Sequence, residues 1–293
     1  MPLLEEIKNV LSFAAFRPDP DDANIPWSKR FVKSRSLLLN VSRTQTSWRS
    51  INKRGRYQEA GAEDGDLAEV ARQHAEEWRG MIDSGWCAVS LNNRFIISLE
   101  NNLSRRENQA ELLRLNPKAV LGAKCDRGKR YAIYHHPATT SSLLMACDDA
   151  FVKIAEDTLR GNNLRAGRIC CGLFAMMEAK LNEIYTLGKP EATGSFMLVA
   201  LCEGSIAALV QQNGQWTDLR CRSGVGMDSA DAMFQIVSPL AQKIQPGTPV
   251  LFLHDGIHKT FAAEMLQQLQ QDGQVDVQDI SVEDQLWNII GKN

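Results

Sequence analysis

Short apolar runs alternate with amphipathic stretches along most of this chain, which predicts strands interleaved with helices. The runs near the start indicate a meander of three strands, followed by a long helix that Asp64 or Asp66 can cap. The strands are predicted at Ser36–Val41, Thr46–Asn52 and Arg56–Glu59, with a tight turn at Arg54-Gly55, and the helix at Asp66–Met81. Mixed elements of this kind are typical of an α/β protein.

The middle of the chain continues in the same way. Ser104 and Glu107 have the spacing of a capping box for a helix that ends near Leu115. Asp126-Arg127-Gly128 is a hairpin signal between two further strands. The remaining strands are predicted at Trp86–Ser90, Arg94–Leu99, Ala119–Cys125, Arg130–His135, Ser142–Ala146 and Arg168–Cys171, and the helices at Asp149–Arg160 and Ala175–Ile184.

A second meander follows the Gly188–Gly194 linker and repeats the first. Ser36–Tyr57 and Ser195–Trp216 share an apolar strand, a short turn, a second strand and a turn that contains glycine. The strands of the second meander are predicted at Phe196–Ala200, Ser205–Gln211 and Gln215–Cys221. After it we expect a helix at Ser229–Ile244, a strand at Val250–His254, a helix at Lys259–Gln271, a strand at Val275–Val277 and a helix at Gln285–Ile290.

The composition and charge of the chain argue against several classes of function. The 293 residues are 44% hydrophobic and 23% charged with a formal net charge of -2, which gives no electrostatic reason to expect nucleic acid as a partner. No apolar stretch reaches the roughly 18 residues that a membrane span needs, and the N-terminus lacks the features of a signal peptide, so no direct membrane insertion is expected. Seven cysteines without a CxxC pair predict reduced thiols in a cytoplasmic protein.

The order of elements resembles the actin-like ATPase superfamily, and within it most closely the PilM family of type IV pilus assembly and the GspL-type cytoplasmic domains of type II secretion. Three stretches carry the resemblance: Ser36–Tyr57, Leu144–Leu181 with a turn at Leu164–Ile169, and Ser195–Gly224. It implies an α/β fold of two actin-like lobes, a duplicated RNase H-like fold. We expect an N-terminal helix and linker at 1–34, a first lobe at 35–190 with an inserted α/β subdomain at about 66–140, and a second lobe at 191–293.

The resemblance also implies where a nucleotide site would lie. In ATP-using members, an Asp followed by Gly ends the first strand, and here Asn40-Val41-Ser42-Arg43 stands in that place. The second unit has Ala200-Leu201-Cys202, with Glu203-Gly204 displaced along the chain, and His254-Asp255-Gly256 replaces the Gly-Gly of the adenosine side. The residues of this degenerate site are Asn40, Ser42, Glu203, Gly204, Asp255 and Gly256.

Each acid near this site has two interpretations. Glu203, Asp228 and Asp255 are candidate ligands, and each is also a residue type that caps helices and closes turns. An amide at position 40 cannot supply the carboxylate that a magnesium ion needs. No ATP hydrolysis is therefore expected, while ATP binding stays open.

No other motif indicates chemistry. The chain has no P-loop, GxSxG or HExxH sequence. His254 and His258 are four residues apart, but Gly256 between them speaks against one continuous helix, so no metal site is predicted.

The resemblance implies a non-catalytic cytoplasmic scaffold of a type IV pilus or type II secretion assembly platform. Its partner would be a bitopic inner-membrane assembly protein, whose short cytoplasmic segment would hold the scaffold at the inner membrane. Residues 40–43 are a candidate rim for that segment. Homo-oligomerisation stays open. Two alternatives also stay open: a divergent actin-like ATP-binding protein with ATPase or kinase activity, and an adaptor of another assembly that shares only the fold.

Overall fold

The computed structural model describes residues 35–52, 54, 56–83, 85–101, 103, 109–226, 230–273 and 276–291. The predicted N-terminal helix and linker, the Ser104–Glu107 capping box and Asp228 lie outside these residues. The chain divides into two compact units. The first comprises the chain up to Leu91, Lys153–Cys170 and the residues from Ile290, and the second comprises Asn92–Val152 and Cys171–Ile289.

The first unit is built on a five-stranded sheet in the order β3-β2-β1-β4-β8. Three strands form the predicted antiparallel meander, and β4 and β8 extend it in parallel beside β1. Every residue of β1 and β4 is buried, which is typical of strands covered on both faces. The strands are β1 (Ser36–Val41), β2 (Gln45–Ile51), β3 (Tyr57–Asp64), β4 (Trp86–Leu91) and β8 (Arg165–Cys170).

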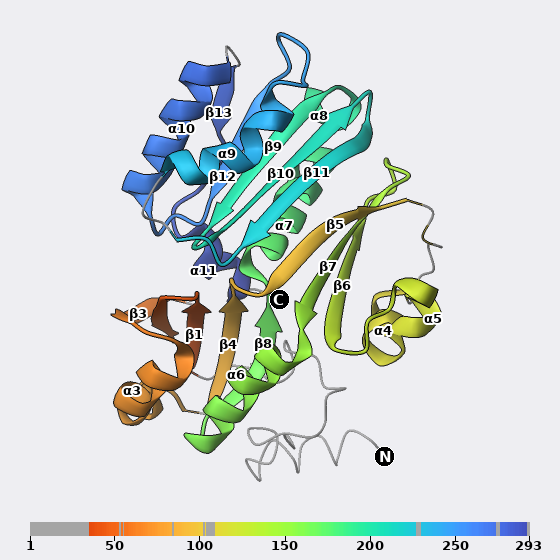
Figure 1. Ribbon diagram of the computed structural model, residues 1–293. Coiled ribbons are helices and arrows are strands. Elements are labelled where there is room, and N and C mark those ends of the chain that lie inside the picture. The colour runs from red at the N-terminus through yellow and green to blue at the C-terminus, as the bar shows by residue number, and fades with distance from the viewer. Residues whose placement is uncertain are drawn as a thin grey trace. The chain divides into compact units, whose positions relative to one another are not determined.

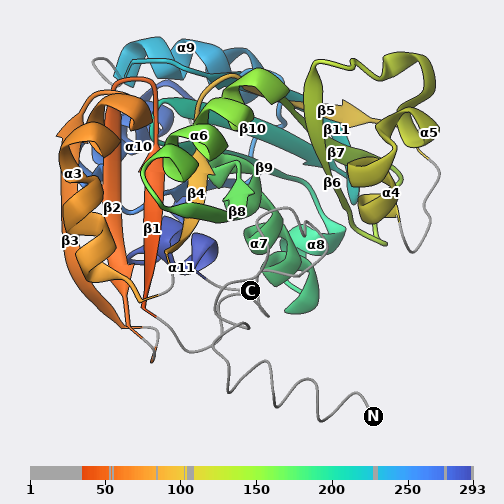
Figure 2. The ribbon, with the colours of Figure 1, turned by 90° about the horizontal axis from the view of Figure 1, so that it is seen from below.

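Helix α3 (Leu67–Met81) lies along the meander of the first unit (Figure 2). The predicted cap at Asp66 is confirmed, because its Oδ1 accepts hydrogen bonds from the backbone N–H groups of Ala68 and Glu69 at 2.9 and 3.0 Å. The Glu69 carboxylate accepts in return from the Asp66 N–H at 3.2 Å, which completes a capping box. The long helix therefore begins where local sequence directs it.

The second unit contains a sheet of the same design, in the order β11-β10-β9-β12-β13. Again an antiparallel meander is extended by two parallel strands beside its first strand, so the predicted duplication is confirmed. Helices α9 (Ala230–Ala241) and α10 (Lys259–Gly273) cover one face, and α7 (Gly172–Thr186) packs on the other (Figure 1). The strands are β9 (Phe196–Cys202), β10 (Ser205–Gln212), β11 (Gln215–Ser223), β12 (Val250–His254) and β13 (Val277–Asp279).

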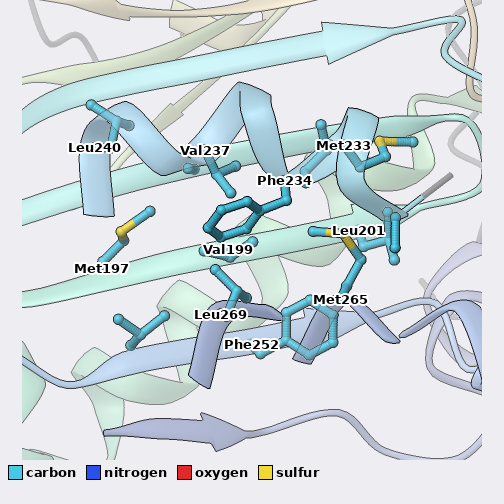
Figure 3. Packing of buried hydrophobic residues seen from close by; sticks show 14 of the residues in the cluster. Met197, Val199, Leu201, Met233, Phe234, Val237, Leu240, Phe252, Met265 and Leu269 are labelled. Atoms are coloured by element: carbon cyan, nitrogen blue, oxygen red, sulfur yellow. The ribbon is translucent and has the colours of Figure 1, made fainter. Parts of the chain in front are cut away.

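The core of this sheet shows why its strands take the observed register. Met197, Val199 and Leu201 alternate along β9 and point toward α9 and α10 (Figure 3). Phe252 of β12 meets Met265 of α10 in the same cluster (Figure 3). A shift of one residue would turn all of these side chains away from the helices, so their packing against α9 and α10 favours the observed pairing.

The second unit also carries a three-stranded antiparallel sheet in the order β5-β7-β6. Its small core joins Leu113, Leu121 and Leu144. Strand β5 lies beside β11, where the Ser223 hydroxyl donates to the Phe95 carbonyl at 2.7 Å and accepts from the Phe95 N–H at 3.2 Å. The elements are β5 (Phe95–Glu100), β6 (Lys129–His135), β7 (Ser142–Asp148), α4 (Gln109–Leu115), α5 (Pro117–Leu121) and the 3₁₀-helix Gly122–Lys124.

Two local predictions are wrong. The predicted strand Ala119–Cys125 is helical, because Asn116 accepts from the Ala119 N–H at 3.3 Å and Pro117 occupies the first turn. The predicted turn at Leu164–Ile169 is instead strand from Arg165 onward, paired with β4. The elements not yet named are α6 (Asp149–Gly161), α8 (Pro190–Thr193) and α11 (Gln285–Ile290). The lobe boundaries 35–190 and 191–293 stay predictions.

Candidate functional site

The turn between β1 and β2 is closed by its own serine. The Ser42 hydroxyl accepts hydrogen bonds from the backbone N–H groups of Thr44 and Gln45 at 3.3 and 3.1 Å. It also donates to the Gln45 carbonyl at 3.1 Å, and the Ser42 N–H donates to that same carbonyl at 3.0 Å. The Thr44 and Gln45 amides therefore already have a partner within the turn.

Asn40 lies two residues before this turn, in the middle of the first sheet. It is fully buried, opposite Ser47 of β2 and Ser90 of β4. Its Nδ2 donates to the Ser47 hydroxyl at 3.5 Å. A neutral amide is tolerated here, whereas a carboxylate in the same place would have to be neutralised or paired.

In the second unit, Glu203 and Gly204 form the turn between β9 and β10. Gly204 has a φ of +66°, and a Cβ at this position would approach the Val225 carbonyl oxygen to 3.1 Å. The Gly204 carbonyl accepts from the Val225 N–H at 2.9 Å. The glycine is favoured because both its positive φ and the nearby Val225 carbonyl, in the segment after β11, oppose a side chain here.

Asp255 follows β12 and ties this turn to the start of α10. Its Oδ2 accepts from the Glu203 N–H at 2.9 Å, and its Oδ1 accepts from the N–H groups of Ile257 and His258 at 2.8 and 3.4 Å. Gly256, with a φ of +79°, donates its N–H to Nδ1 of His254 at 3.0 Å. The structure thus brings Glu203, Gly204, Asp255 and Gly256 together.

Two buried carboxylates meet one histidine in this cluster. Glu203 and Asp255 are 4% and 2% exposed, and Nε2 of His258 lies 3.7 Å from Oε2 of Glu203. The Glu203 carboxylate raises the pKa of His258 against the opposing effect of burial, and Asp255 adds to the rise. Protonated His258 therefore compensates negative charge that is otherwise withdrawn from water.

The sequence does not predict this pairing, because its pattern presents His258 only as a metal ligand beside His254. An aspartate three residues before a histidine at a helix start is a usable signal for the local bonds of Asp255. Nothing in the sequence indicates the contact to Glu203. In the part of the chain that the structure describes, no group of three or more His, Cys, Asp or Glu side chains is placed to hold a metal ion.

The hydrogen bonds of these turns favour a structural role over phosphate binding. The N–H groups of Thr44, Gln45, Glu203, Gly256 and Ile257 all donate to side chains of this chain. In the second unit, a phosphate would also meet the buried carboxylates of Glu203 and Asp255, which would repel it. Within the described residues, no helix is long and apolar enough to cross a bilayer.

Comparison with known proteins places the fold. No protein-family model and no curated protein sequence matches the chain. A chain of the PilM–PilN type IV pilus biogenesis complex superimposes with a TM-score of 0.52 at 13% identity, over 87% of this chain and 89% of that one. A Bacteroides thetaiotaomicron protein of actin-like ATPase fold and unknown function gives a TM-score of 0.51 at 12% identity, over 92% and 99%.

The predicted fold class is thereby confirmed. Each of the two sheets has the meander with two added parallel strands, and two solved structures match the chain over most of its length. Identities of 12% and 13% are informative about the fold alone. This chain has the actin-like ATPase fold, and PilM is among the proteins that it resembles in structure.

Proposed function

We propose that this protein is a non-catalytic scaffold in the assembly platform of a type IV pilus or type II secretion system. In this proposal it binds a short cytoplasmic segment of a bitopic inner-membrane protein. One observation carries the non-catalytic part: in the turns where a nucleotide phosphate would be held, the backbone N–H groups of Thr44, Gln45, Glu203 and Ile257 already donate to side chains of this chain.

The chemistry of the two units supports the same conclusion. Asn40 carries no charge for a metal ion, and the carboxylate of Asp255 is engaged by three backbone N–H groups. Recruiting Asp255 to a metal would strip those N–H groups of their partner, and buried unpaired donors are costly. The degenerate site Asn40, Ser42, Glu203, Gly204, Asp255 and Gly256 is therefore proposed as structural.

The partner is proposed from the structural similarity. The matching chain belongs to the PilM–PilN complex, an assembly of two different proteins. By analogy, we propose that this chain acts through a protein partner and resides in the cytoplasm, held peripherally at the inner membrane. Burial raises the thiol pKa of Cys87 to about 12 and of Cys170 to about 11, as expected of unreactive thiols.

The test has two arms. First, affinity-tagged full-length protein is purified with cross-linked membranes, and a bitopic inner-membrane protein should be recovered in stoichiometric amount. Second, saturating Mg-ATP should leave the melting temperature unchanged, whereas a ligand at 100 times its Kd would add about 2.7 kcal/mol of stability. Recovery of no membrane protein would refute the partner, and a rise of several degrees with ATP turnover would refute the non-catalytic assignment.

A further inference from the structure

The segment that forms β1 and β2 carries charge of one sign only. Residues 23–58 contain nine lysine and arginine side chains and no aspartate or glutamate, although the whole chain has 35 acidic against 33 basic residues. Soluble surfaces normally intersperse the two signs, so a long run of one sign indicates a surface that meets the opposite charge. The members that the structure describes are Arg35, Arg43, Arg49, Arg54 and Arg56.

Two of these arginines lie in the turn between β2 and β3, which Asn52 orders. Oδ1 of Asn52 accepts from the backbone N–H groups of Arg54 and Arg56 at 2.9 and 3.0 Å, and the Asn52 N–H donates to the Arg56 carbonyl at 2.9 Å. These bonds use only the backbone of the two arginines, and both residues are exposed. Within the described residues, neither guanidinium group forms an ion pair.

The basic turn that precedes β6 shows the opposite arrangement. There Lys129 lies 3.7 Å from a carboxylate oxygen of Asp148, and Arg130 lies 2.7 Å from one of Asp149. The chain thus compensates the charge of one basic turn with carboxylates and leaves the β2–β3 turn uncompensated. A turn that keeps neighbouring like charges without compensation breaks a local rule, as functional surfaces do.

Arg49 of β2 adds a third cation beside this turn. Its guanidinium carbon lies 5.1 Å from the centroid of the Tyr57 ring, at the start of β3. Trp48 packs against Trp78 of α3 with 5.4 Å between ring centroids, so strand alternation places Arg49 on the other face of the sheet. Tyr57 is half-buried, and a ring with one apolar and one polar end suits the boundary between water and lipid.

We propose that Arg49, Arg54 and Arg56, here called the arginine hairpin, contact the anionic phospholipid surface of the inner membrane. The contact is electrostatic and peripheral, because the phosphate groups lie outside the hydrocarbon core. A flat layer of phosphates requires no cavity. It requires exposed cations that are free of carboxylate partners, and Arg54 and Arg56 meet that requirement.

A bilayer fits this surface better than a nucleic acid does. Nucleic-acid-binding domains are usually basic overall, with an isoelectric point above about 9, and they carry cations along a stripe. This chain has an isoelectric point of about 6.2. The arginine hairpin is confined to one end of the first sheet, so an extended polyanion would meet few cations, whereas a membrane surface needs only one point of contact.

The inference rests on the proposed function in one respect: the protein has to reside next to the inner membrane. The register of the meander places the turn at residues 42–44 and the β2–β3 turn at opposite ends of its strands. Lipid contact at the arginine hairpin therefore leaves residues 40–43 free for the segment of the membrane partner.

The test is co-sedimentation of the full-length protein, without any partner, with two kinds of vesicle. One kind contains equal parts of phosphatidylglycerol and phosphatidylcholine, and the other contains phosphatidylcholine alone. The protein should bind the anionic vesicles and not the neutral ones. Since each arginine near an anionic surface is worth about a fivefold change in affinity, Arg54→Ser with Arg56→Ser should weaken binding about 25-fold. The difference should shrink as salt is raised.

Arg127→Ser with Lys129→Ser is the matched control, because it removes the same charge from the other basic turn. It should change the affinity by less than about twofold. Arg54→Lys with Arg56→Lys keeps the charge and should also stay within about twofold of the wild type.

Four results would overturn the proposal. The first is equal binding to neutral vesicles, and the second is an equal loss in the control pair, which would make the attraction a matter of net charge. The third is a loss in the lysine pair as large as in the serine pair, since charge is the proposed basis. The fourth is binding of a fluorescein-labelled DNA duplex, at the same salt, as tight as binding of the anionic vesicles.

The outcome is separable from that of the proposed function. If tagged protein recovers a bitopic membrane protein but purified protein ignores anionic vesicles, the scaffold function stands and the lipid contact is refuted. If the vesicles bind through the arginine hairpin but no membrane protein is recovered, the lipid contact stands and the partner is refuted.

Discussion

The carboxylate of Asp255 accepts a hydrogen bond from the backbone N–H of Glu203 at 2.9 Å, across 52 positions of sequence. This bond joins the meander of the second sheet to the parallel strand β12 beside it, at the end of the sheet where β9 turns into β10. Asp255, a candidate ligand by its sequence, therefore has a structural role.

Removing this carboxylate should destabilise the protein strongly. Asp255→Ala leaves the N–H groups of Glu203 and Ile257 without their partner, and we expect the free energy of unfolding to fall by about 3 kcal/mol. Asp255→Asn should cost less, about 1–2 kcal/mol, because its amide can accept through only one of its two terminal atoms. Urea denaturation followed by circular dichroism measures both. A loss below that of exposed Glu264→Gln would contradict the structural role.

The His258–Glu203 pair should make stability depend on pH. Because the folded-state pKa of His258 is raised above its ordinary 6.5, its contribution is fully present below about pH 6.5 and is lost as pH rises through the raised pKa. His258→Gln should remove this part of the pH profile. Unfolding free energies measured between about pH 6 and about pH 9 test it in the wild type, in each single variant and in His258→Gln/Glu203→Gln. If the single and double variants keep the wild-type slope, another group is responsible.

The Ser42 hydroxyl should contribute stability without masking a latent nucleotide site. Ser42→Ala deprives the Thr44 and Gln45 N–H groups of their acceptor, with an expected loss of about 1–2 kcal/mol. Thr44→Ala is the matched control, since that side chain is exposed, and it should be nearly neutral. Isothermal titration of Ser42→Ala with Mg-ATP should show no heat of binding. A measurable affinity would mean that the hydroxyl had been blocking a functional turn.

Gly204 should not tolerate a side chain. Gly204 has a φ of +66°, and an added Cβ would lie only 3.1 Å from the Val225 carbonyl oxygen. We therefore expect Gly204→Ala to lower the free energy of unfolding by about 1–2 kcal/mol. Gly80→Ala provides the opposite expectation, because Gly80 lies in α3 and a Cβ there meets nothing within 4 Å. That change should leave stability equal or raise it by up to about 1 kcal/mol. Thermal unfolding of the two variants separates the effects.

Much of the fold could be predicted from local pattern. The meanders, the capped helix at Asp66 and the strand Val250–His254 follow from apolar periodicity and from side chains that act within a few residues. The prediction for Ala119–Cys125 failed because its apolar residues suit a strand as well as a helix. Asn116 and Pro117 favour the helix, because they cap and begin it just before Ala119.

The candidate site was less predictable for a physical reason. Sequence pointed to Glu203 and Asp255 as departures from an expected motif, but their contact joins two strands that are distant along the chain. Whether a backbone N–H in a turn is already hydrogen-bonded depends on such long-range contacts. The periodicity of the sequence does not predict them.

The order of strands in the first sheet has a consequence for synthesis on the ribosome. Strand β4 pairs with β8 on the side away from β1, yet β8 is translated only after the whole β5–β7 sheet. Since chains emerge at about 5–20 residues per second, β4 waits several seconds with one row of backbone groups unpaired. An unpaired strand of this kind invites pairing with another nascent chain. We therefore expect newly made protein to depend most on chaperones during the interval before Arg165–Cys170 emerges.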